Sequence, residues 1–216
     1  MKKYELTDEA MNDDLVTLHR IKALAAFADV AVGDLGGWIE SERNLAQSGN
    51  AWVGGNARVS DNAWVSGNAR VSGNAWVSGN ARVSGNARVS GNARVSGNAR
   101  VSGNARVCGN ARVSGNARVS GNAWVRGNAW VGGNKHYMAI GPIGSRDDTL
   151  TFARDKSGRI FASVGCFYGP LPDFLVKVEE THGNNIHAKA YLLAAQLAEA
   201  RIDTTPIEED KEDVAK

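Results

Sequence analysis

The chain has 216 residues and a formal net charge of +2, and 43% of its residues are hydrophobic. This length suits a repeat-built domain together with one further small domain. No stretch is apolar for long enough to cross a bilayer, and the charged segment 1–14 is unlike the apolar core of a secretory signal. With two cysteines, too few for a disulfide framework, the sequence predicts a cytoplasmic protein without membrane partners.

The small net charge hides a strong partition along the chain. Residues 48–131 contain ten arginines and one acidic residue, Asp61, which gives this segment a charge of +9. The other residues carry 15 basic and 22 acidic side chains, a charge of −7. The middle of the chain is therefore cationic and its two ends are acidic.

Residues 1–34 precede the repeats, and we expect them to cap the first coil, because an open strand edge invites aggregation. Within this cap, residues 15–21 (Leu-Val-Thr-Leu-His-Arg-Ile) have the composition of a strand, and residues 22–27 that of a short helical turn. His19 is interpreted as a surface residue of the cap.

Residues 48–131 repeat one six-residue phrase, Ser-Gly-Asn-Ala-Arg/Trp-Val, fourteen times with few changes and no insertion. Such a period indicates a solenoid, because no single phrase can bury its apolar side alone. Ala and Val stand two places apart, so in an extended segment both point inward, and the Arg or Trp between them points outward. Ser, Gly and Asn then form a corner. A string of hairpins with Gly-Asn turns is the alternative, but it would need longer strands.

The phrase Val-Ser-Gly-Asn-Ala-Arg resembles the signature of hexapeptide-repeat proteins, whose fold is a left-handed parallel β-helix. The resemblance implies a mainly β, triangular solenoid with three phrases, or 18 residues, in each coil. Counting by sixes from Val53 extends the register back to Leu35 and forward to Tyr137. The solenoid is therefore predicted over residues 35–137.

The N-terminal part resembles a narrower group. His19-Arg-Ile-Lys-Ala-Leu, Asp34-Leu-Gly-Gly-Trp-Ile-Glu and Asn44-Leu-Ala-Gln are similar to the cap of hexapeptide-repeat proteins from enterobacteria and bacteriophages. Those proteins are labelled as transferases or as polymer-forming, cytoskeleton-like proteins, mostly because of their fold. This resemblance implies a bacterial host cell as the setting.

With 18 residues in each coil, the outward residues fall into three columns, and every tryptophan has an arginine one coil away. Such ladders would bind a polyanion such as nucleic acid through phosphate contacts and base stacking. Alternatively, repeat expansion copied a soluble residue onto every coil, and the equal number of arginines on the three faces favours this over sequence-specific binding. The column arginines are Arg70, Arg88 and Arg106; Arg58, Arg94 and Arg112; and Arg82, Arg100 and Arg118.

Enzymes that resemble this fold transfer acyl groups from coenzyme A, with a histidine on or near an extruded loop as general base. The chain has no histidine between residues 20 and 135, and the uninterrupted register leaves no room for such a loop. We therefore assign no catalytic residue, cofactor or metal site, since a fold alone does not confer an activity.

Residues 138–202 are predicted to form a small α+β domain. Strands are expected over 137–143, 149–154 and 159–167, and helices over 173–181 and 186–202. The second helix carries an apolar stripe that packs on the sheet or pairs with a second copy of the chain, and packing on the sheet is the expected use. The tail 203–216 is acidic and expected to be disordered. The stripe consists of Ile186, Ala190, Leu193, Leu197 and Ala200.

A specific site is expected in this α+β domain, because its polar residues are not repeated elsewhere. Ser145 and Arg146 follow a Gly-Pro-Ile-Gly turn and offer backbone amides and a cation to an anion. Cys166 would bring a thiol near His182 or His187, as in nucleophilic catalysis, although no third orienting residue is evident. The alternatives are a tight hairpin, and a buried cysteine with capping histidines.

These features predict a non-enzymatic binding or scaffold protein, and the resemblance to phage proteins implies a phage or prophage origin. Its rigid cationic solenoid would carry a C-terminal domain that binds a partner, a ligand or another copy of the chain. A coenzyme A-dependent acyltransferase is the first alternative. Nonspecific binding of polyanions and self-assembly into filaments are further alternatives.

Overall fold

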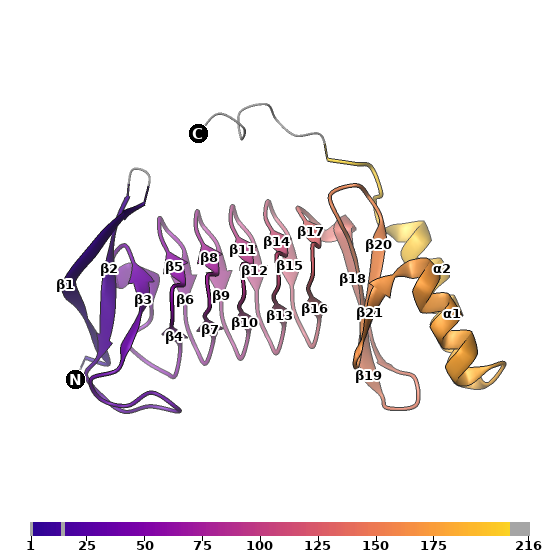
Figure 1. The fold of residues 1–216 in the computed structure, drawn as a ribbon, viewed down its shortest axis with the longest axis horizontal. Helices are drawn as coiled ribbons and strands as arrows, with labels where there is room; N and C mark the ends of the chain where they lie inside the picture. The colour runs from indigo at the N-terminus through magenta and orange to yellow at the C-terminus, as the bar shows by residue number, and fades with distance from the viewer. Residues whose placement is uncertain (1, 14–15, 208–216) are drawn as a thin grey trace. The chain divides into compact units, whose positions relative to one another are not determined.

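The computed structural model describes residues 2–13 and 16–207. It divides into two compact units, Met1–Asn134 and Lys135–Lys216 (Figure 1). Among the described residues, no helix is long and apolar enough to span a membrane. Residue 15 of the expected cap strand and residues 208–216 of the expected tail lie outside the described residues.

The first unit contains a parallel β-solenoid, as the six-residue period predicts (Figure 1). Each repeat strand is two residues long and pairs in parallel with the strand one coil away, as Arg88 does with Arg106. Three sheets result, one for each side of the coil. The first sheet contains β5 (Arg58–Val59), β8 (Trp76–Val77), β11 (Arg94–Val95), β14 (Arg112–Val113) and β17 (Trp130–Val131). The second contains β4 (Trp52–Val53), β7 (Arg70–Val71), β10 (Arg88–Val89), β13 (Arg106–Val107) and β16 (Trp124–Val125). The third contains β6 (Trp64–Val65), β9 (Arg82–Val83), β12 (Arg100–Val101) and β15 (Arg118–Val119).

The repeated alanines and valines fill the interior of the solenoid. Each repeat valine from Val53 to Val131 is at most 1% exposed, and each repeat alanine from Ala51 to Ala129 is at most 3% exposed. The expectation that both residues of the phrase point inward is therefore confirmed. Because a coil removes the apolar surface of its neighbours from water, the stack is stabilised coil by coil.

Glycines at the corners allow the coils to approach closely. Gly91 has a φ of +69°, and a Cβ atom there would lie 3.0 Å from the backbone nitrogen of Gly109. Glycine is suited both to the left-handed conformation and to the close approach. Asp61 adopts the same conformation (φ 56°), and its Oδ2 accepts a hydrogen bond from the backbone N–H of Gly79 (2.7 Å).

The cap extends one solenoid sheet with antiparallel strands. β1 (Tyr4–Asp13) pairs with β2 (Val16–Ala23), β2 pairs with β3 (Leu35–Ile39), and β3 lies parallel to β5. The expected helical turn over 22–27 is wrong. β2 continues to Ala23, and a tight turn follows that is closed by a bridge between Phe27 and Val30.

The predicted register of the first coil is also wrong. Ile39 pairs with Val59, which lies 20 rather than 18 residues along the chain. Ile39 is fully buried and takes the inward valine position, whereas Leu35 is 52% exposed. Two extra residues therefore enter the coil before Val53, and one of them is Gln47. Its Oε1 accepts from the backbone N–H of Lys3 (2.8 Å) and its Nε2 donates to the carbonyl of Tyr4 (3.1 Å), which ties the cap to the solenoid.

The second unit is an antiparallel sheet on which two helices pack. Its strands, in sheet order, are β18 (Tyr137–Ile143), β19 (Asp148–Arg154), β20 (Ile160–Val164) and β21 (Phe167–Pro170). The helices are α1 (Leu171–His182) and α2 (Ile186–Arg201), and short 3-10 helices η1 (Glu42–Asn44) and η2 (Asn134–His136) lie earlier in the chain. The strand expected over 159–167 is two strands, because Gly165 (φ 51°) turns the chain between them. Tyr137, expected to end the solenoid, begins β18 and pairs with Ala153.

Candidate functional site

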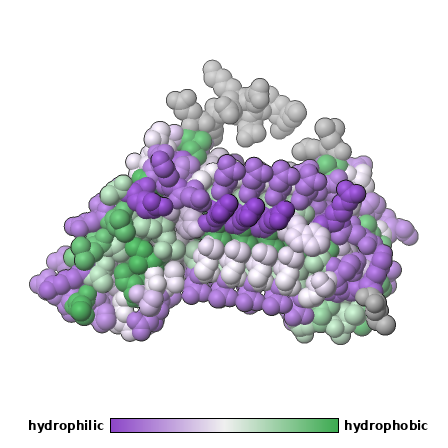
Figure 2. Space-filling model, turned by 180° about the vertical axis from the view of Figure 1, so that it is seen from behind, coloured by the Kyte–Doolittle hydropathy of each residue, from purple (hydrophilic) through white to green (hydrophobic). Residues whose placement is uncertain are grey.

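The outward arginines stand in three columns, one on each sheet of the solenoid. On the second sheet the column runs through Trp52, Arg70, Arg88, Arg106 and Trp124, each paired with the next. Figure 2 shows bands of like hydropathy along the solenoid, as a repeated sequence produces. Cationic and aromatic side chains are thus neighbours one coil apart, as the 18-residue period predicts.

Guanidinium groups already lie on three of the repeat tryptophan rings on which a bound base would stack. Arg94 lies 5.6 Å from the ring centroid of Trp76, and Arg112 lies 4.5 Å from that of Trp130. Trp124 has Arg106 at 5.5 Å. Such pairs contribute about 0.5 to 1 kcal/mol each at exposed sites. A base that stacked there would have to displace them, which weakens the nucleic-acid interpretation.

The acidic cap neutralises two of the column arginines. Nη1 of Arg58 lies 2.7 Å from Oδ2 of Asp13, and Arg70 forms an ion pair with Asp29. Burial, and then repulsion from Arg88, lowers the pKa of Arg70. The first and second sheets are therefore less cationic near the cap than the sequence indicates.

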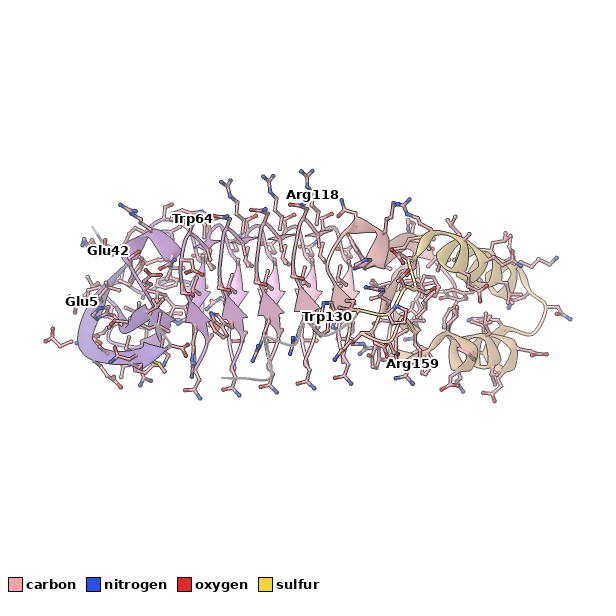
Figure 3. All side chains as sticks on the ribbon, turned by 90° about the horizontal axis from the view of Figure 1, so that it is seen from above. Glu5, Glu42, Trp64, Arg118, Trp130 and Arg159 are labelled. Atoms are coloured by element: carbon pink, nitrogen blue, oxygen red, sulfur yellow. The ribbon has the colours of Figure 1, made fainter. Side chains whose placement is uncertain are left out.

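The third sheet carries the most accessible column. Trp64 is 38% exposed, and Arg82, Arg100 and Arg118 follow it on successive coils, all of them exposed. Figure 3 shows Trp64 and Arg118 on the same edge of the solenoid. If a polyanion binds the solenoid, this column is where we expect it.

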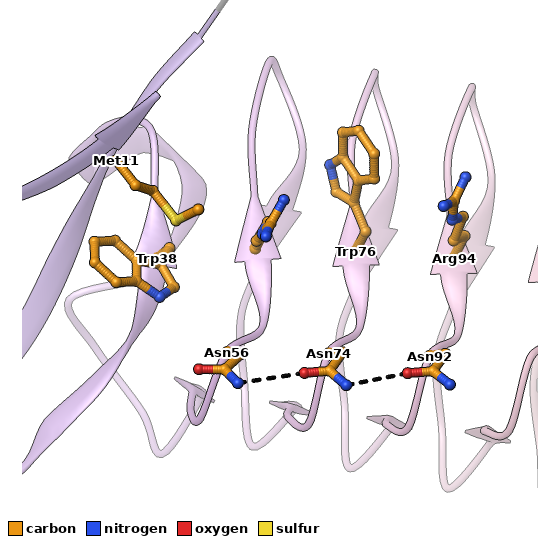
Figure 4. A pocket seen from close by; sticks show the side chains of 8 residues that line it. Met11, Trp38, Asn56, Asn74, Trp76, Asn92 and Arg94 are labelled. Carbon is orange, nitrogen blue, oxygen red and sulfur yellow. Dashed lines mark hydrogen bonds between the residues drawn. The ribbon is translucent and has the colours of Figure 1, made fainter. Parts of the chain in front are cut away.

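A groove of about 560 Å³ lies on the first sheet beside the cap (Figure 4). An amide ladder runs along it: Nδ2 of Asn56 donates to Oδ1 of Asn74 (3.4 Å), and Nδ2 of Asn74 donates to Oδ1 of Asn92 (3.1 Å). The six-residue period alone does not predict this ladder. Because these amides contact one another and Arg58 contacts the cap, the groove presents groups that already have partners. It is lined by Met11, Trp38, Asn56, Arg58, Asn74, Trp76, Asn92 and Arg94.

A cavity of about 420 Å³ in the second unit brings together four of the five site residues expected there. Ser145 and Arg146 come from the turn between β18 and β19, Cys166 from the turn between β20 and β21, and His182 from the end of α1. His187 does not line the cavity, but its ring centroid lies 5.8 Å from that of His182. The remaining lining residues are Asp148, Val164, Gly165, Phe167, Phe174, Lys177, Val178, Thr181 and Tyr191.

Aromatic side chains form the floor of this cavity. Phe174 is 2% exposed, and its ring centroid lies 5.6 Å from those of Phe167 and Tyr191. Burial, followed by the charge of Asp148, raises the pKa of Tyr191 above its ordinary value. Its phenol O–H can donate a hydrogen bond. Gly144 (φ 79°) packs against this phenol, and a methyl group there would overlap the hydroxyl.

Charged groups stand at the rim of the cavity, two of them cationic and one anionic. Oδ1 of Asp148 accepts a hydrogen bond from the backbone N–H of Thr149 (2.7 Å), which keeps this carboxylate in its turn. Nζ of Lys177 lies 3.1 Å from Oε2 of Glu180, and both of these side chains are largely exposed. Together with Arg146, Lys177 gives the lining a net positive charge. The cavity thus combines an apolar floor with a cationic rim.

Sequence reasoning missed the floor of the cavity and Lys177. Phe174 and Val178 belong to the buried face of α1, and Tyr191 belongs to that of α2. Their spacing indicates burial, but the opening above them depends on how two turns of the sheet meet the helices.

The expectation that the apolar stripe of α2 packs on the sheet is wrong. Ile186 is 76% exposed, Leu193 is 66% exposed and Leu197 is 50% exposed. The helix packs instead through the opposite face, which consists of Ala188, Tyr191, Ala194, Ala195 and Ala198. Pairing of two copies through the stripe stays a prediction.

Within the described residues, no group of three His, Cys, Asp or Glu side chains is placed to hold a metal ion.

Two comparisons with known proteins bear on these observations. Overlapping segments over residues 51–133 match the family described as the YdcK β-solenoid repeat. A stretch of 61 residues is 41% identical to the uncharacterized acetyltransferase YdcK of Escherichia coli (strain K12). That match covers 24% of this chain and 19% of the relative, so the chain spans about a fifth of that protein. Together with the stacked coils, these matches show that residues 51–133 form a β-solenoid whose repeats are similar to those of YdcK.

Proposed function

We propose that the protein is a non-enzymatic binding protein, in which the solenoid is a rigid support and the second unit holds a small ligand. The observation that carries this proposal is the 420 Å³ cavity. Its polar side chains do not recur along the chain, whereas the solenoid presents the same residues on coil after coil. A cavity with an apolar floor and a few convergent polar groups is the usual form of a small-molecule site.

The proposal includes a phage or prophage origin and action in the bacterial cytoplasm. The cap sequences around His19 and Asp34, which resemble those of phage and enterobacterial proteins, support this origin.

Acyl transfer is a second candidate function, because the relative is named as an acetyltransferase. The groups for such chemistry would be Cys166 and His182, which line the same cavity. Two observations weigh against it. The match covers 19% of the relative, and the sequence has no histidine between residues 20 and 135.

A thermal unfolding screen of the whole chain tests the proposal. The panel contains nucleotides, small aromatic acids, acyl coenzyme A thioesters and short DNA. All six tryptophans precede residue 131, so their fluorescence reports the first unit, and both described α-helices lie in the second unit, so the helical circular dichroism signal reports that one. We expect a ligand to raise the helical transition and leave the tryptophan transition unchanged.

Two outcomes would overturn this proposal. If the panel shifts only the tryptophan transition, with DNA and with steep salt dependence, the solenoid is the binding element. If an acyl coenzyme A is consumed, and the Cys166→Ala variant no longer consumes it, the protein is an acyltransferase.

A further inference from the structure

We infer that the cavity of the second unit binds a small anion that carries a planar aromatic ring, with the ring on the floor and the anionic group at Arg146 and Lys177. This inference rests on the proposed function and names the class of ligand. The shared chemistry is that of an aryl carboxylate, an aryl phosphate or a nucleoside monophosphate.

The floor selects for a flat ring. Phe174 and Tyr191 meet edge to face, with an interplanar angle of 88°, and Phe167 is tilted by 53° to Phe174. Rings packed in this way form a rigid apolar wall, which suits a flat aromatic ring better than a flexible alkyl chain. Val164 and Val178 complete an apolar lining.

The rim selects for an anion. Arg146 presents a planar guanidinium that can bind two oxygen atoms of a carboxylate or phosphate side by side. Lys177 adds a second cation, which an anion reaches by displacing the exposed ion pair with Glu180. His182 stands on the same rim, with its ring centroid 5.6 Å from that of Tyr191. The phenol O–H of Tyr191, which also lines the cavity, is a further donor for an anionic oxygen.

Asp148 is the one carboxylate among the lining residues, so neutralising it tests whether the ligand carries a negative or a positive charge. It repels an anion held at Arg146, and the hydrogen bond to Thr149 keeps it close to the turn. Neutralising Asp148 should therefore strengthen binding, while neutralising Arg146 should weaken it. A ligand that was a cation seated among the aromatic rings would respond in the opposite way.

The experiment is calorimetric titration of the whole chain with phenyl phosphate and with AMP. Phenol and adenosine are the neutral counterparts, and inorganic phosphate is the anion without a ring. We expect both aryl anions to bind at least about ten-fold more tightly than their neutral counterparts and than phosphate. Arg146→Gln should weaken them about ten-fold or more, and Asp148→Asn should strengthen them a few-fold. Lys189→Gln, on an exposed part of α2 outside the cavity, is the matched control and should change affinity less than two-fold.

The outcomes separate this inference from the proposed function. Neutral rings that bind as tightly as the anions, or phosphate that binds as tightly as phenyl phosphate, would overturn the ligand class while the cavity remains a binding site. Failure of every compound, here and in the wider thermal screen, would overturn the proposed function itself. If a variant does not fold by circular dichroism, the salt dependence of phenyl phosphate binding to the unmodified protein replaces it. Affinity that does not fall with added salt would then contradict the inference.

Discussion

Replacing corner glycines by alanine measures how much the close approach of neighbouring coils contributes to the stability of the solenoid. The same substitution is made at three positions. Gly55, Gly91 and Gly121 have nearly the same backbone, with φ of +64°, +69° and +66°. Their surroundings differ. A Cβ atom on Gly91 would lie 3.0 Å from the backbone nitrogen of Gly109, one on Gly55 would have its nearest neighbour at 3.4 Å, and one on Gly121 would have none within 4 Å.

Replacement by alanine should therefore separate two costs. The left-handed conformation costs about 1 to 2 kcal/mol for a residue with a Cβ atom, and this cost is common to all three positions. Overpacking against backbone adds about 1 to 3 kcal/mol, and only at Gly91. The gain from a less flexible unfolded chain cancels in the comparison. We expect Gly91→Ala to destabilise the solenoid by about 1 to 3 kcal/mol more than Gly55→Ala or Gly121→Ala.

Urea unfolding followed by tryptophan fluorescence measures this difference, because all six tryptophans lie in the first unit. The two controls stand in an early and a late coil, so they bracket any effect of fraying at the ends of the stack. Equal free energies of unfolding for the three variants would refute the reasoning, since the corner of Gly91 would then have room for a methyl group.

Four further predictions concern the cap, the solenoid surface and α2. Gln47→Ala removes the hydrogen bonds to the backbone of Lys3 and Tyr4. It should destabilise the first unit by about 1 to 3 kcal/mol and speed proteolysis of β1. An unchanged cleavage rate would show that the Gln47 amide does not hold β1 on the solenoid. Burial, and then repulsion from Arg70, lowers the pKa of Lys3 to about 8 in the folded protein, compared with 10.5 in the unfolded chain. Between these two pH values the unfolded chain binds more protons than the folded protein, so the free energy of unfolding should rise with pH. Lys3→Met should abolish that rise, and a rise that persists in Lys3→Met would contradict the assignment. Light scattering should show that the unmodified chain forms a species larger than a monomer. The double substitution Leu193→Glu and Leu197→Glu should dissociate this species, whereas Val176→Glu, at an exposed position on α1, should leave it intact. A monomeric unmodified chain would exclude pairing through the stripe. Neutralising Arg82 and Arg100 should reduce the salt dependence of short-DNA binding more than neutralising Arg58 and Arg70, which are paired with the cap; equal effects would show that no column is preferred.

The sequence was sufficient to predict those parts of the fold that depend on a repeated local pattern. Every repeat buries its alanine and valine, because alternation in an extended strand leaves these residues no other side. The first coil escaped prediction for the same reason. Its two extra residues serve the contact of Gln47 with Tyr4, which lie 43 residues apart, and no local spacing encodes such a contact.

The second unit shows a similar division. The positions of its strands and helices were predicted within a few residues, apart from β21, which the turn at Gly165 separates from β20. Leucine and isoleucine usually favour burial, which is why the stripe of α2 is predicted to belong to the core. In the structure, the buried face of α2 consists instead of four alanines and Tyr191. Unrepeated polar residues drew attention to Ser145, Arg146, Cys166 and His182, whereas the aromatic floor beneath them depends on packing between elements.

Hydrogen exchange measured by mass spectrometry, with and without saturating phenyl phosphate, tests the central claim most directly. If the solenoid is a support and the second unit is the binding element, exchange should slow in residues 144–148, 164–167 and 177–191 and stay unchanged over 51–133. Slower exchange within residues 51–133, with none in the second unit, would contradict the account.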